Sequence, residues 1–369
     1  MADLENPLKL LAKQGQSVWY DNIHRAMLHS GELERLIERD AVTGITSNPA
    51  IFEKAITGSA DYDEAIRALL ARNPGRVARD LFYDLAVEDI QQAADRFRPV
   101  YEATDGRDGF VSLEVSPDLA YEVEATVAEA VHLWERLDRP NAMIKVPATQ
   151  QGVAAFETLV AQGINVNVTL LFSVARYESI AQAYIRALQR RHEQGLSISG
   201  IASVASFFVS RVDSALGQPL SDAGRPELQG VIAIANAKLA YQRYQAMFGA
   251  AFAALAADGA QPQRLLWAST STKDPAARDV LYVESLIGPE TVNTLPPATL
   301  EAFRDHGVVA ESLTLGVEEA MNAVNALTAA GVDLTEITDR LEADGVGSFA
   351  DAFRNVLAAL DRKSEDLAA

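Results

Sequence analysis

Residues 163–173 read Gly-Ile-Asn-Val-Asn-Val-Thr-Leu-Leu-Phe-Ser, and a longer segment rich in Ala and Arg, residues 174–191, follows at once. The alternation of polar residues with valine is typical of a β-strand over 165–171, because successive side chains of a strand point to opposite faces. The longer segment has apolar residues at helical spacing, which predicts an α-helix. A strand followed by a helix is the repeating unit of an α/β fold with parallel strands.

The same pairing of a short β-branched segment with a longer helical one recurs along the chain. It gives eight candidate strands, the other seven being 18–23, 41–47, 110–115, 141–146, 201–209, 264–270 and 292–295. Further predicted helices are 117–137, 227–255 and 274–286, and the prolines near the start of the first and third are typical of a first helical turn. Eight such units predict a closed (β/α)8 barrel, the TIM barrel.

Two segments exceed what a minimal barrel needs. Additional helices are expected in about 48–105, between the second and third strands, and in about 310–365 at the C-terminal end. No Ser-, Gly- or Pro-rich linker separates either segment from its neighbours. The sequence therefore predicts a single barrel domain over residues 1–369.

The chain is strongly acidic. Its 369 residues include 32 Lys and Arg against 51 Asp and Glu, for a net charge of −19. Such a charge repels nucleic-acid phosphates and anionic membrane surfaces, so neither is an expected partner. The longest apolar stretch, 246–257, falls short of the ~20 residues of a membrane helix, and residues 1–6 do not resemble a signal peptide. We expect a cytoplasmic protein, and an anionic substrate would need local cations.

Several kinds of site have no support in the sequence. The chain has no cysteine, so it has no disulfide, thiolate metal site or cysteine nucleophile. Its five histidines lie outside the predicted strands and are not at ligand spacing, which argues against zinc. No glycine-rich dinucleotide motif follows a strand, and neither a Walker A lysine nor a G-x-S-x-G elbow occurs. We expect neither a metal nor a cofactor.

Polar residues in the predicted strands indicate the functional end of the barrel, because active sites lie at the C-terminal ends of barrel strands. Asn165, Asn167 and Thr169 share one face of their strand, and burying them is costly unless they are hydrogen-bonded. A structural hydrogen-bond network would satisfy them, and so would a ligand site, which gathers convergent polar groups. The ligand site is the favoured interpretation.

One lysine, Lys145, lies in the otherwise apolar strand 141–146. On its own, a lysine near a strand end is more often one that extends its ammonium to water. The functional alternative is a nucleophilic amine that forms a Schiff base, since burial disfavours the charged ammonium.

Two carboxylates end predicted strands. Glu114 shares a face with Ser112 and Ser116, and because Ser116 is placed to cap the following helix, Glu114 is free for acid–base work. Asp21 ends the first strand, where it could act in the same way or could cap a helix over 23–37.

Small polar and cationic residues end further strands. Ser206 lies late in the sixth strand, and Arg211 lies at the start of the helix that follows. Ser269 and Lys273 lie after the seventh strand. Hydroxyls at such positions commonly cap helices, but the two cations on an acidic chain favour a phosphate site at these late loops. Asn48, before Pro49, is typical of a turn.

Together these motifs resemble the transaldolase family, in particular its longer bacterial type. The resemblance spans about residues 10–300 and rests on segments that occur in the expected order, namely 46–52 (TSNPAIF), 111–116 (VSLEVS), 144–149 (IKVPAT), 163–173 (GINVNVTLLFS), 205–211 (ASFFVSR) and 267–275 (WASTSTKDP). It implies a (β/α)8 barrel without metal or cofactor. The implied reaction moves a dihydroxyacetone unit from sedoheptulose 7-phosphate or fructose 6-phosphate to an aldose phosphate, glyceraldehyde 3-phosphate or erythrose 4-phosphate, in the non-oxidative pentose phosphate pathway.

The resemblance assigns a role to each chemical group. Lys145, on the fourth strand, would attack the ketose carbonyl and form the imine. Glu114 would work as acid and base through a water molecule held partly by Thr169. Asp21 would take the proton from the hydroxyl next to the bond that breaks.

The remaining implied roles concern binding. Asn48 and Asn167 would hold the hydroxyls of the bound three-carbon unit, and Ser206 and Arg211 would bind the phosphate. Shorter transaldolases often have a second arginine in the seventh-strand loop, where this chain has residues 271–273 (Ser-Thr-Lys). Lys273 would replace that arginine, or phosphate binding would depend more on Arg211 and Ser269.

Two other functions stay open on the sequence alone. A Schiff-base aldolase would release free dihydroxyacetone instead of passing it to an acceptor. An inactive barrel could bind sugar phosphates without turnover, although such a chain is expected to have lost Lys145 or a carboxylate. Barrels of this kind occur as monomers and as homodimers.

Overall fold

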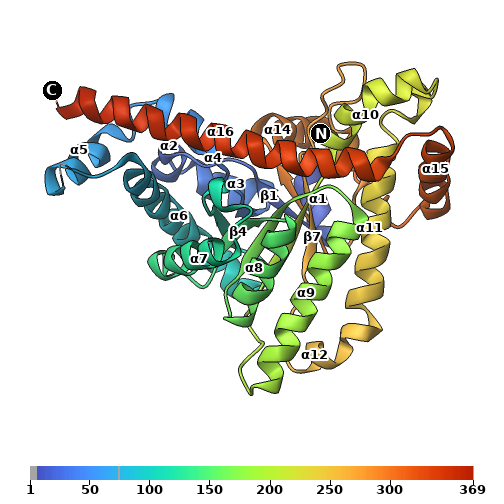
Figure 1. The fold of residues 1–369 in the computed structure, drawn as a ribbon, viewed down its shortest axis with the longest axis horizontal. Coiled ribbons are helices and arrows are strands. Elements are labelled where there is room, and N and C mark those ends of the chain that lie inside the picture. The colour runs from blue at the N-terminus through green and yellow to red at the C-terminus, as the bar shows by residue number, and fades with distance from the viewer. Residues whose placement is uncertain (1–5, 74, 369) are drawn as a thin grey trace, which may run out of the picture.

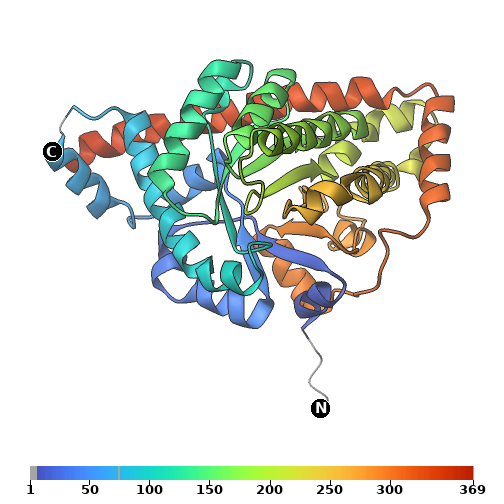
Figure 2. The same ribbon diagram turned by 90° about the horizontal axis from the view of Figure 1, so that it is seen from below.

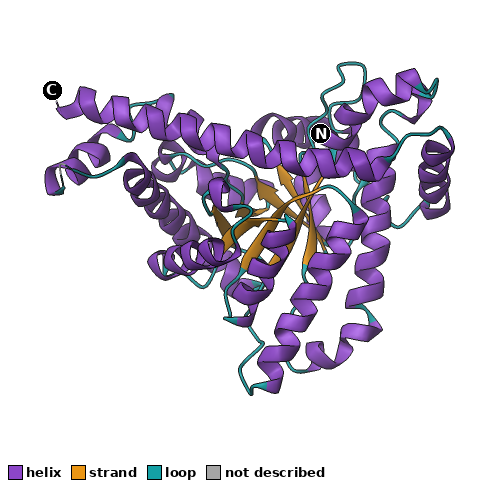
Figure 3. Ribbon diagram, viewed as in Figure 1, coloured by secondary structure: helices purple, strands orange, loops and turns teal. Residues whose placement is uncertain are grey.

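The computed structural model describes residues 6–73 and 75–368, and its centre is a closed barrel of eight parallel strands in chain order. The strands are short and buried along nearly their whole length (Figure 3). Their bounds are β1 Gln16–Tyr20, β2 Val42–Ile45, β3 Phe110–Glu114, β4 Ala142–Pro147, β5 Val166–Leu171, β6 Ser203–Phe208, β7 Arg264–Ala268 and β8 Thr291–Leu295. The predicted TIM barrel and each of its eight strands are confirmed.

Helices surround the barrel on the outside (Figures 1 and 2). They are α1 Pro7–Lys13, α2 Arg25–His29, α3 Glu32–Asp40, α4 Pro49–Thr57, α5 Asp63–Arg72, α6 Ala78–Ala103, α7 Val123–Leu137, α8 Gln150–Ala161, α9 Val174–Glu193, α10 Ser210–Asp222, α11 Ile232–Phe248, α12 Ala253–Ala257, α13 Leu281–Ser285, α14 Pro297–His306, α15 Val317–Ala329 and α16 Leu334–Ala368. Short 3-10 turns occupy Pro117–Leu119, Pro226–Leu228 and Ala250–Phe252. None of these helices is long and apolar enough to cross a bilayer.

Two helix predictions were wrong at their starts, and one of the two roles left open for Asp21 is excluded. Residues 274–280 do not begin a helix, because the Asp274 carboxylate accepts a hydrogen bond from the Ala276 amide and forms a turn, so that α13 starts only at Leu281. The predicted helix 117–137 begins with a 3-10 turn, and α7 starts at Val123. Asp21 caps no helix, since His24 Nδ1 accepts the hydrogen bond from the Met27 amide at the start of α2.

The predicted helix 227–255 is also interrupted. It holds α11, a 3-10 turn and α12 in place of one continuous helix. The break falls at Gly249, whose backbone angles (φ −82°, ψ −130°) lie outside the helical region.

The barrel interior is filled at its N-terminal end. Trp19 on β1 faces Gly44 on β2, where a Cβ atom would lie 2.6 Å from the indole ring. Asp108, just before β3, accepts hydrogen bonds from Trp19 Nε1 at 2.9 Å and from Ser17 Oγ at 2.6 Å, and it pairs with Arg264 of β7 at 3.0 Å. Because this end is closed by packed and paired groups, the open end of the barrel is the one at which the strands terminate.

The last helix, α16, lies across that open end. Figure 1 shows it in red, running from α15 to α5 over the barrel. Three ion pairs hold it along its length: Glu342 with Arg176 of α9 at 3.0 Å, Arg354 with Asp118 at 3.6 Å, and Lys363 with Asp63 of α5 at 2.7 Å. The helix therefore contacts elements on opposite sides of the barrel.

The Asp108 cluster generates a stability prediction. Asp108→Ala should lower the free energy of unfolding by about 3–5 kcal/mol, because it leaves the buried Arg264 guanidinium without its counter-charge. Equilibrium urea unfolding measures the difference. The matched control is Arg107→Ala on the same loop, which removes only the exposed pair with Glu290 and should cost less than about 1 kcal/mol. Equal losses in the two variants would contradict the importance assigned to the buried pair.

Candidate active site

A cavity of about 170 Å³ opens at the C-terminal ends of the strands. Every predicted site residue lines it except two: Glu114, which lies beside Lys145, and Asn167, which accepts a hydrogen bond from Ser206. The lining residues are Asp21, Thr46, Asn48, Lys145, Thr169, Ser206, Phe208, Arg211, Ala268, Ser269, Ser271, Lys273, Thr294, Pro296 and Phe349. The cavity thus gathers side chains from both ends of the chain and from most of the strands.

Lys145 lies at the centre of this arrangement. It is 4% exposed, and its Nζ donates a hydrogen bond to the Ser47 carbonyl oxygen at 3.1 Å. The parallel register places Glu114 on β3 and Asn167 on β5 directly beside it. Its amine lies 3.8 Å from Glu114 Oε2, which is an ion-pair distance and longer than a hydrogen bond.

Glu114 is a buried carboxyl with unusual acidity. Burial raises its pKa to about 7, against the opposing effect of the Lys145 charge. Among the described residues, neither Glu114 Oε2 nor the buried Thr169 hydroxyl has a hydrogen-bond partner. A group that exchanges its proton near neutral pH therefore lies next to the lysine.

Ser116 does not cap a helix, contrary to the expectation from the sequence. Ser116 makes no side-chain cap, because only a 3-10 turn follows it, and its buried hydroxyl has no partner within the described part of the chain. Glu114 itself lies at the end of β3, before that turn, with its carboxyl beside Lys145.

Asp21 lies across the cavity from this pair, at the end of β1. The Thr46 hydroxyl donates to its Oδ1 at 2.6 Å, and Thr294 lies 2.7 Å from the same hydroxyl. Burial raises the pKa of Asp21, while Lys145, Thr46 and Arg211 oppose that rise. Sequence reasoning missed both threonines as site residues. The signal was the polar ends of the second and eighth strands.

Two of the three aligned polar residues, Asn165 just before β5 and Asn167 within it, have side-chain hydrogen bonds to other parts of the protein. Asn165 donates to the carbonyl oxygens of residues 140 and 142 and accepts from the Ala202 amide. Asn167 Nδ2 donates to Ser112 Oγ at 3.1 Å, and its Oδ1 accepts from Ser206 Oγ at 2.7 Å. The network interpretation therefore describes Asn165 fully. Asn167 positions Ser206, a residue of the cavity wall.

Asn48 likewise combines two roles that the sequence left as alternatives. Its Oδ1 accepts a hydrogen bond from the Ile51 amide and caps α4, which begins at Pro49. The same residue lines the cavity next to Asp21. The helix cap fixes the orientation of its amide group.

The opposite side of the cavity is cationic. Arg211, in the first turn of α10, has no carboxylate within ion-pair distance among residues 6–73 and 75–368, and burial lowers its pKa. Lys273 is exposed and donates to Ser271 Oγ at 2.9 Å. Ser269 has a left-handed backbone (φ 54°) and is bonded to Ser210 through its carbonyl and its hydroxyl, so strain is maintained at this wall.

Phe349 is the site residue that sequence reasoning missed most completely. It comes from α16, a helix for which no chemical signature was found. Its ring centroid lies 5.7 Å from Lys145 Nζ and 5.9 Å from Arg211 Cζ, so the ring is close to both the amine and the guanidinium. Phe208 on β6 forms the second aromatic contact of Arg211, at 5.1 Å.

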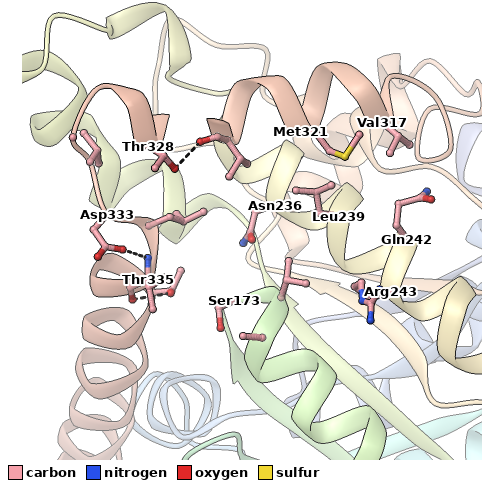
Figure 4. A pocket seen from close by; sticks show the side chains of 17 residues that line it. Ser173, Asn236, Leu239, Gln242, Arg243, Val317, Met321, Thr328, Asp333 and Thr335 are labelled. Atoms are coloured by element: carbon pink, nitrogen blue, oxygen red, sulfur yellow. Dashed lines mark hydrogen bonds between the residues drawn. The ribbon is translucent and has the colours of Figure 1, made fainter. Parts of the chain in front are cut away.

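A larger cavity of about 1020 Å³ lies elsewhere, between the starts of α9 and α16 and the helices α11 and α15 (Figure 4). Its walls are mainly apolar, and its one cation, Arg243, is paired with Glu178. It has no convergent acid–base groups. Size therefore does not identify the reactive site in this molecule, and the residue chemistry favours the smaller cavity.

Within the described residues, no group of three or more His, Asp and Glu side chains is arranged to hold a metal ion. The groups that the site offers are one amine, two carboxyls of raised pKa and a pair of cations. Such a set is suited to imine chemistry on an anionic carbonyl compound.

Known proteins resemble the chain over nearly its whole length. The family model described as transaldolase/fructose-6-phosphate aldolase matches residues 18–360, well beyond the end at about 300 that the motifs indicated. A protein named transaldolase from Saccharopolyspora erythraea is 47% identical, over 95% of each chain. Another of that name from Frankia alni is 47% identical over 96% of each chain, and transaldolase 2 from Nostoc punctiforme is 44% identical over 97%. The chain belongs to the transaldolase/fructose-6-phosphate aldolase family.

Proposed function

We propose that the chain is a transaldolase that works through an imine on Lys145. It transfers a dihydroxyacetone unit from sedoheptulose 7-phosphate or fructose 6-phosphate to glyceraldehyde 3-phosphate or erythrose 4-phosphate, a reaction of the non-oxidative pentose phosphate pathway. The observation that carries the proposal is a buried lysine beside a buried carboxyl, at a cavity that also holds Asp21 and Arg211. Among the described residues Arg211 has no carboxylate partner. Membership of the family and the names of its relatives support it.

The first step is attack of Lys145 on the ketose carbonyl. The carbinolamine that forms must lose water, and this loss needs an acid that then becomes a base. Glu114, with a pKa of about 7, can do both near neutral pH. The free Glu114 Oε2 and Thr169 hydroxyl support a water molecule between them that relays the proton.

The second step is cleavage of the carbon–carbon bond. Asp21 removes the proton from the hydroxyl next to that bond, and the cationic imine accepts the released electron pair as an enamine. The hydrogen bond from Thr46 orients Asp21, and its raised pKa makes it a stronger base than an exposed aspartate. Asn48 and Asn167 hold the three-carbon unit, the second chiefly through Ser206.

The phosphate end of each sugar lies on the cationic side of the cavity. Arg211 supplies a guanidinium without a carboxylate partner among the described residues, and Ser206, Ser269 and Lys273 complete that side. Planar guanidinium groups suit phosphate oxygens well. This arrangement supports a sugar phosphate as the substrate class.

Two alternatives to a transaldolase, an inactive barrel and an aldolase that releases dihydroxyacetone, are less well supported. An inactive barrel is disfavoured because Lys145, Glu114 and Asp21 are all present and all meet at one end of the barrel. An aldolase that releases free dihydroxyacetone shares every residue named so far. The names of this chain's relatives of 44–47% identity, all transaldolases, favour transfer over release.

We also propose the wider setting of the enzyme. A continuous hydrophobic core runs from α1 to α16 and supports a single domain over 1–369. The net charge of −19 supports a protein without nucleic-acid or membrane partners, acting in the cytoplasm as a monomer or homodimer. The chemistry proposed here uses no metal and no cofactor, because the imine itself accepts electrons.

The first prediction concerns the nucleophile. Treatment with fructose 6-phosphate and borohydride should leave a reduced three-carbon adduct on the peptide that contains Lys145. Lys145→Ala should lose turnover by roughly 10³-fold or more, because the covalent route disappears. Peptide mass spectrometry and a steady-state assay measure these results, and circular dichroism checks that the variant is folded. A folded Lys145→Ala variant with near-normal turnover would overturn the assignment.

The second prediction concerns pH. Because Glu114 must be protonated to deliver a proton to the departing water, kcat/KM should fall as the pH rises through an apparent pKa of about 7. Glu114→Gln cannot titrate, so the remaining activity should lack this limb. A pH–rate profile of both proteins from pH 5 to 9 provides the comparison. Persistence of the same limb in Glu114→Gln would assign it to another group.

The third prediction ranks the two cations. Arg211→Met should raise the KM for fructose 6-phosphate about 10–100-fold, the value of a partly buried charge-assisted hydrogen bond. Lys273→Met should raise it only a few-fold, because that lysine is exposed. Unphosphorylated fructose is the control substrate, for which neither change should matter. A larger effect at Lys273 would reverse the ranking.

A further inference from the structure

Phe349 lies in the wall of the active cavity, close to Lys145 and Arg211. Its side chain is buried and lines the active cavity, although it belongs to a helix outside the barrel. The ring lies close to both the amine of Lys145 and the guanidinium of Arg211, at 5.7 and 5.9 Å from its centroid. An acceptor aldehyde with its phosphate on Arg211 and its carbonyl at the Lys145 intermediate would lie beside this ring. Phe349 therefore forms one wall of the acceptor position.

The position of this ring is fixed by its own helix. The three ion pairs of α16 hold the helix on opposite sides of the barrel mouth. One turn after Phe349, Phe353 packs edge-on against Phe82 of α6 at 5.2 Å. One turn before it, Gly345 brings the helix against Leu170 of β5, where a Cβ atom would lie 2.9 Å from the leucine side chain. The ring is thus a fixed wall of the cavity.

The enamine on Lys145 has two possible fates. In transfer, its nucleophilic carbon attacks the acceptor aldehyde, a carbon–carbon bond forms, and the aldehyde oxygen gains a proton. In release, water protonates that same carbon to give an iminium ion. Water then adds to the iminium carbon, the carbon–nitrogen bond breaks, and dihydroxyacetone leaves with the free lysine amine. Release consumes one water molecule in total, and its committing step is protonation at carbon.

We infer that Phe349 determines reaction specificity by keeping water away from the enamine carbon, so that the intermediate waits for an acceptor aldehyde. The inference deepens the proposed function and rests on it. The ring closes one side of the acceptor position in a cavity of about 170 Å³, so that water does not reach the intermediate from that side. The water that serves Glu114 and Thr169 is on the β3–β5 side, so imine formation and product hydrolysis keep their own supply.

The test compares release with transfer in side-chain variants. For each protein, the rate of dihydroxyacetone formation from fructose 6-phosphate alone is divided by the rate of transfer to erythrose 4-phosphate. Phe349→Ala should raise this ratio about tenfold or more, because it opens the wall to water. Phe349→Leu keeps most of the volume and should change the ratio by only about two-fold. In deuterium oxide, the dihydroxyacetone released by Phe349→Ala should carry deuterium at the former enamine carbon.

The matched control is Val346→Ala, which removes buried volume from the same face of α16 but does not line the cavity. It should leave the ratio unchanged. A ratio that is unchanged in Phe349→Ala, or that rises equally in Val346→Ala, would overturn the inference. If Phe349→Ala does not fold, Phe349→Val is judged by the same criterion.

Failure of the proposed function has a different signature. Borohydride trapping on the unmodified protein tests the Lys145 imine by itself. Trapping at Lys145 together with an unchanged ratio in Phe349→Ala would overturn the role of Phe349 and leave the transaldolase proposal standing. No trapping would overturn both.

Discussion

The site depends on one pair of neighbours, Lys145 and Glu114, held side by side by the parallel register of β3 and β4. At 3.8 Å the two groups interact strongly without a direct hydrogen bond. Burial penalises both ionic forms, and in water-poor surroundings their attraction offsets only part of that penalty. The rise of the Glu114 pKa to about 7 expresses this balance. Glu114 can therefore take up or release a proton at little cost near neutral pH.

The fold accounts for how this pair is reached. Register brings Glu114, Lys145 and Asn167 into one row across three adjacent strands, and the closed barrel returns Asp21 to the opposite wall of the same cavity. The far end of the barrel is sealed by the packed indole of Trp19 and the buried Asp108–Arg264 pair. Substrate access is thus confined to the end where the strands terminate. The buried cluster of Trp19, Asp108 and Arg264 and the cavity with the reactive groups therefore lie at opposite ends of the same eight strands.

Much of this arrangement could be predicted from the sequence, and the exceptions have physical reasons. Strand periodicity and the C-terminal-end rule mark Lys145, Glu114, Asp21 and Thr169 as candidates. They leave structural alternatives open for Lys145 and Asp21. Asn165 is indistinguishable in sequence from its neighbours on β5, and only its carbonyl partners show that it is structural. The helix predicted over 274–286 was wrong because a local turn at Asp274 competes with helical hydrogen bonds.

Phe349 could not be predicted for a more general reason. On α16 it follows the same helical spacing as Val346 and Phe353, which belong to the hydrophobic core. A hydrophobic pattern records that a side chain is buried but not what it is buried against. That information depends on contacts between elements far apart in the chain, here the docking of α16 across the barrel mouth. Residues that shape a cavity from outside the strands are therefore the class that periodicity is least able to identify.

The charge balance of the cavity completes the physical account. Carboxylates outnumber cations on this chain, 51 to 32, so an anion is expected to bind only where cations have no carboxylate partner. Among the described residues, neither Arg211 nor Lys273 has such a partner, and both line the cavity. Burial lowers the pKa of Arg211, because the charged guanidinium loses part of its hydration in the free protein. A phosphate group would supply the missing counter-charge and offset that loss only when it is bound. A strongly acidic protein can in this way attract an anionic sugar to one place while its remaining surface repels it.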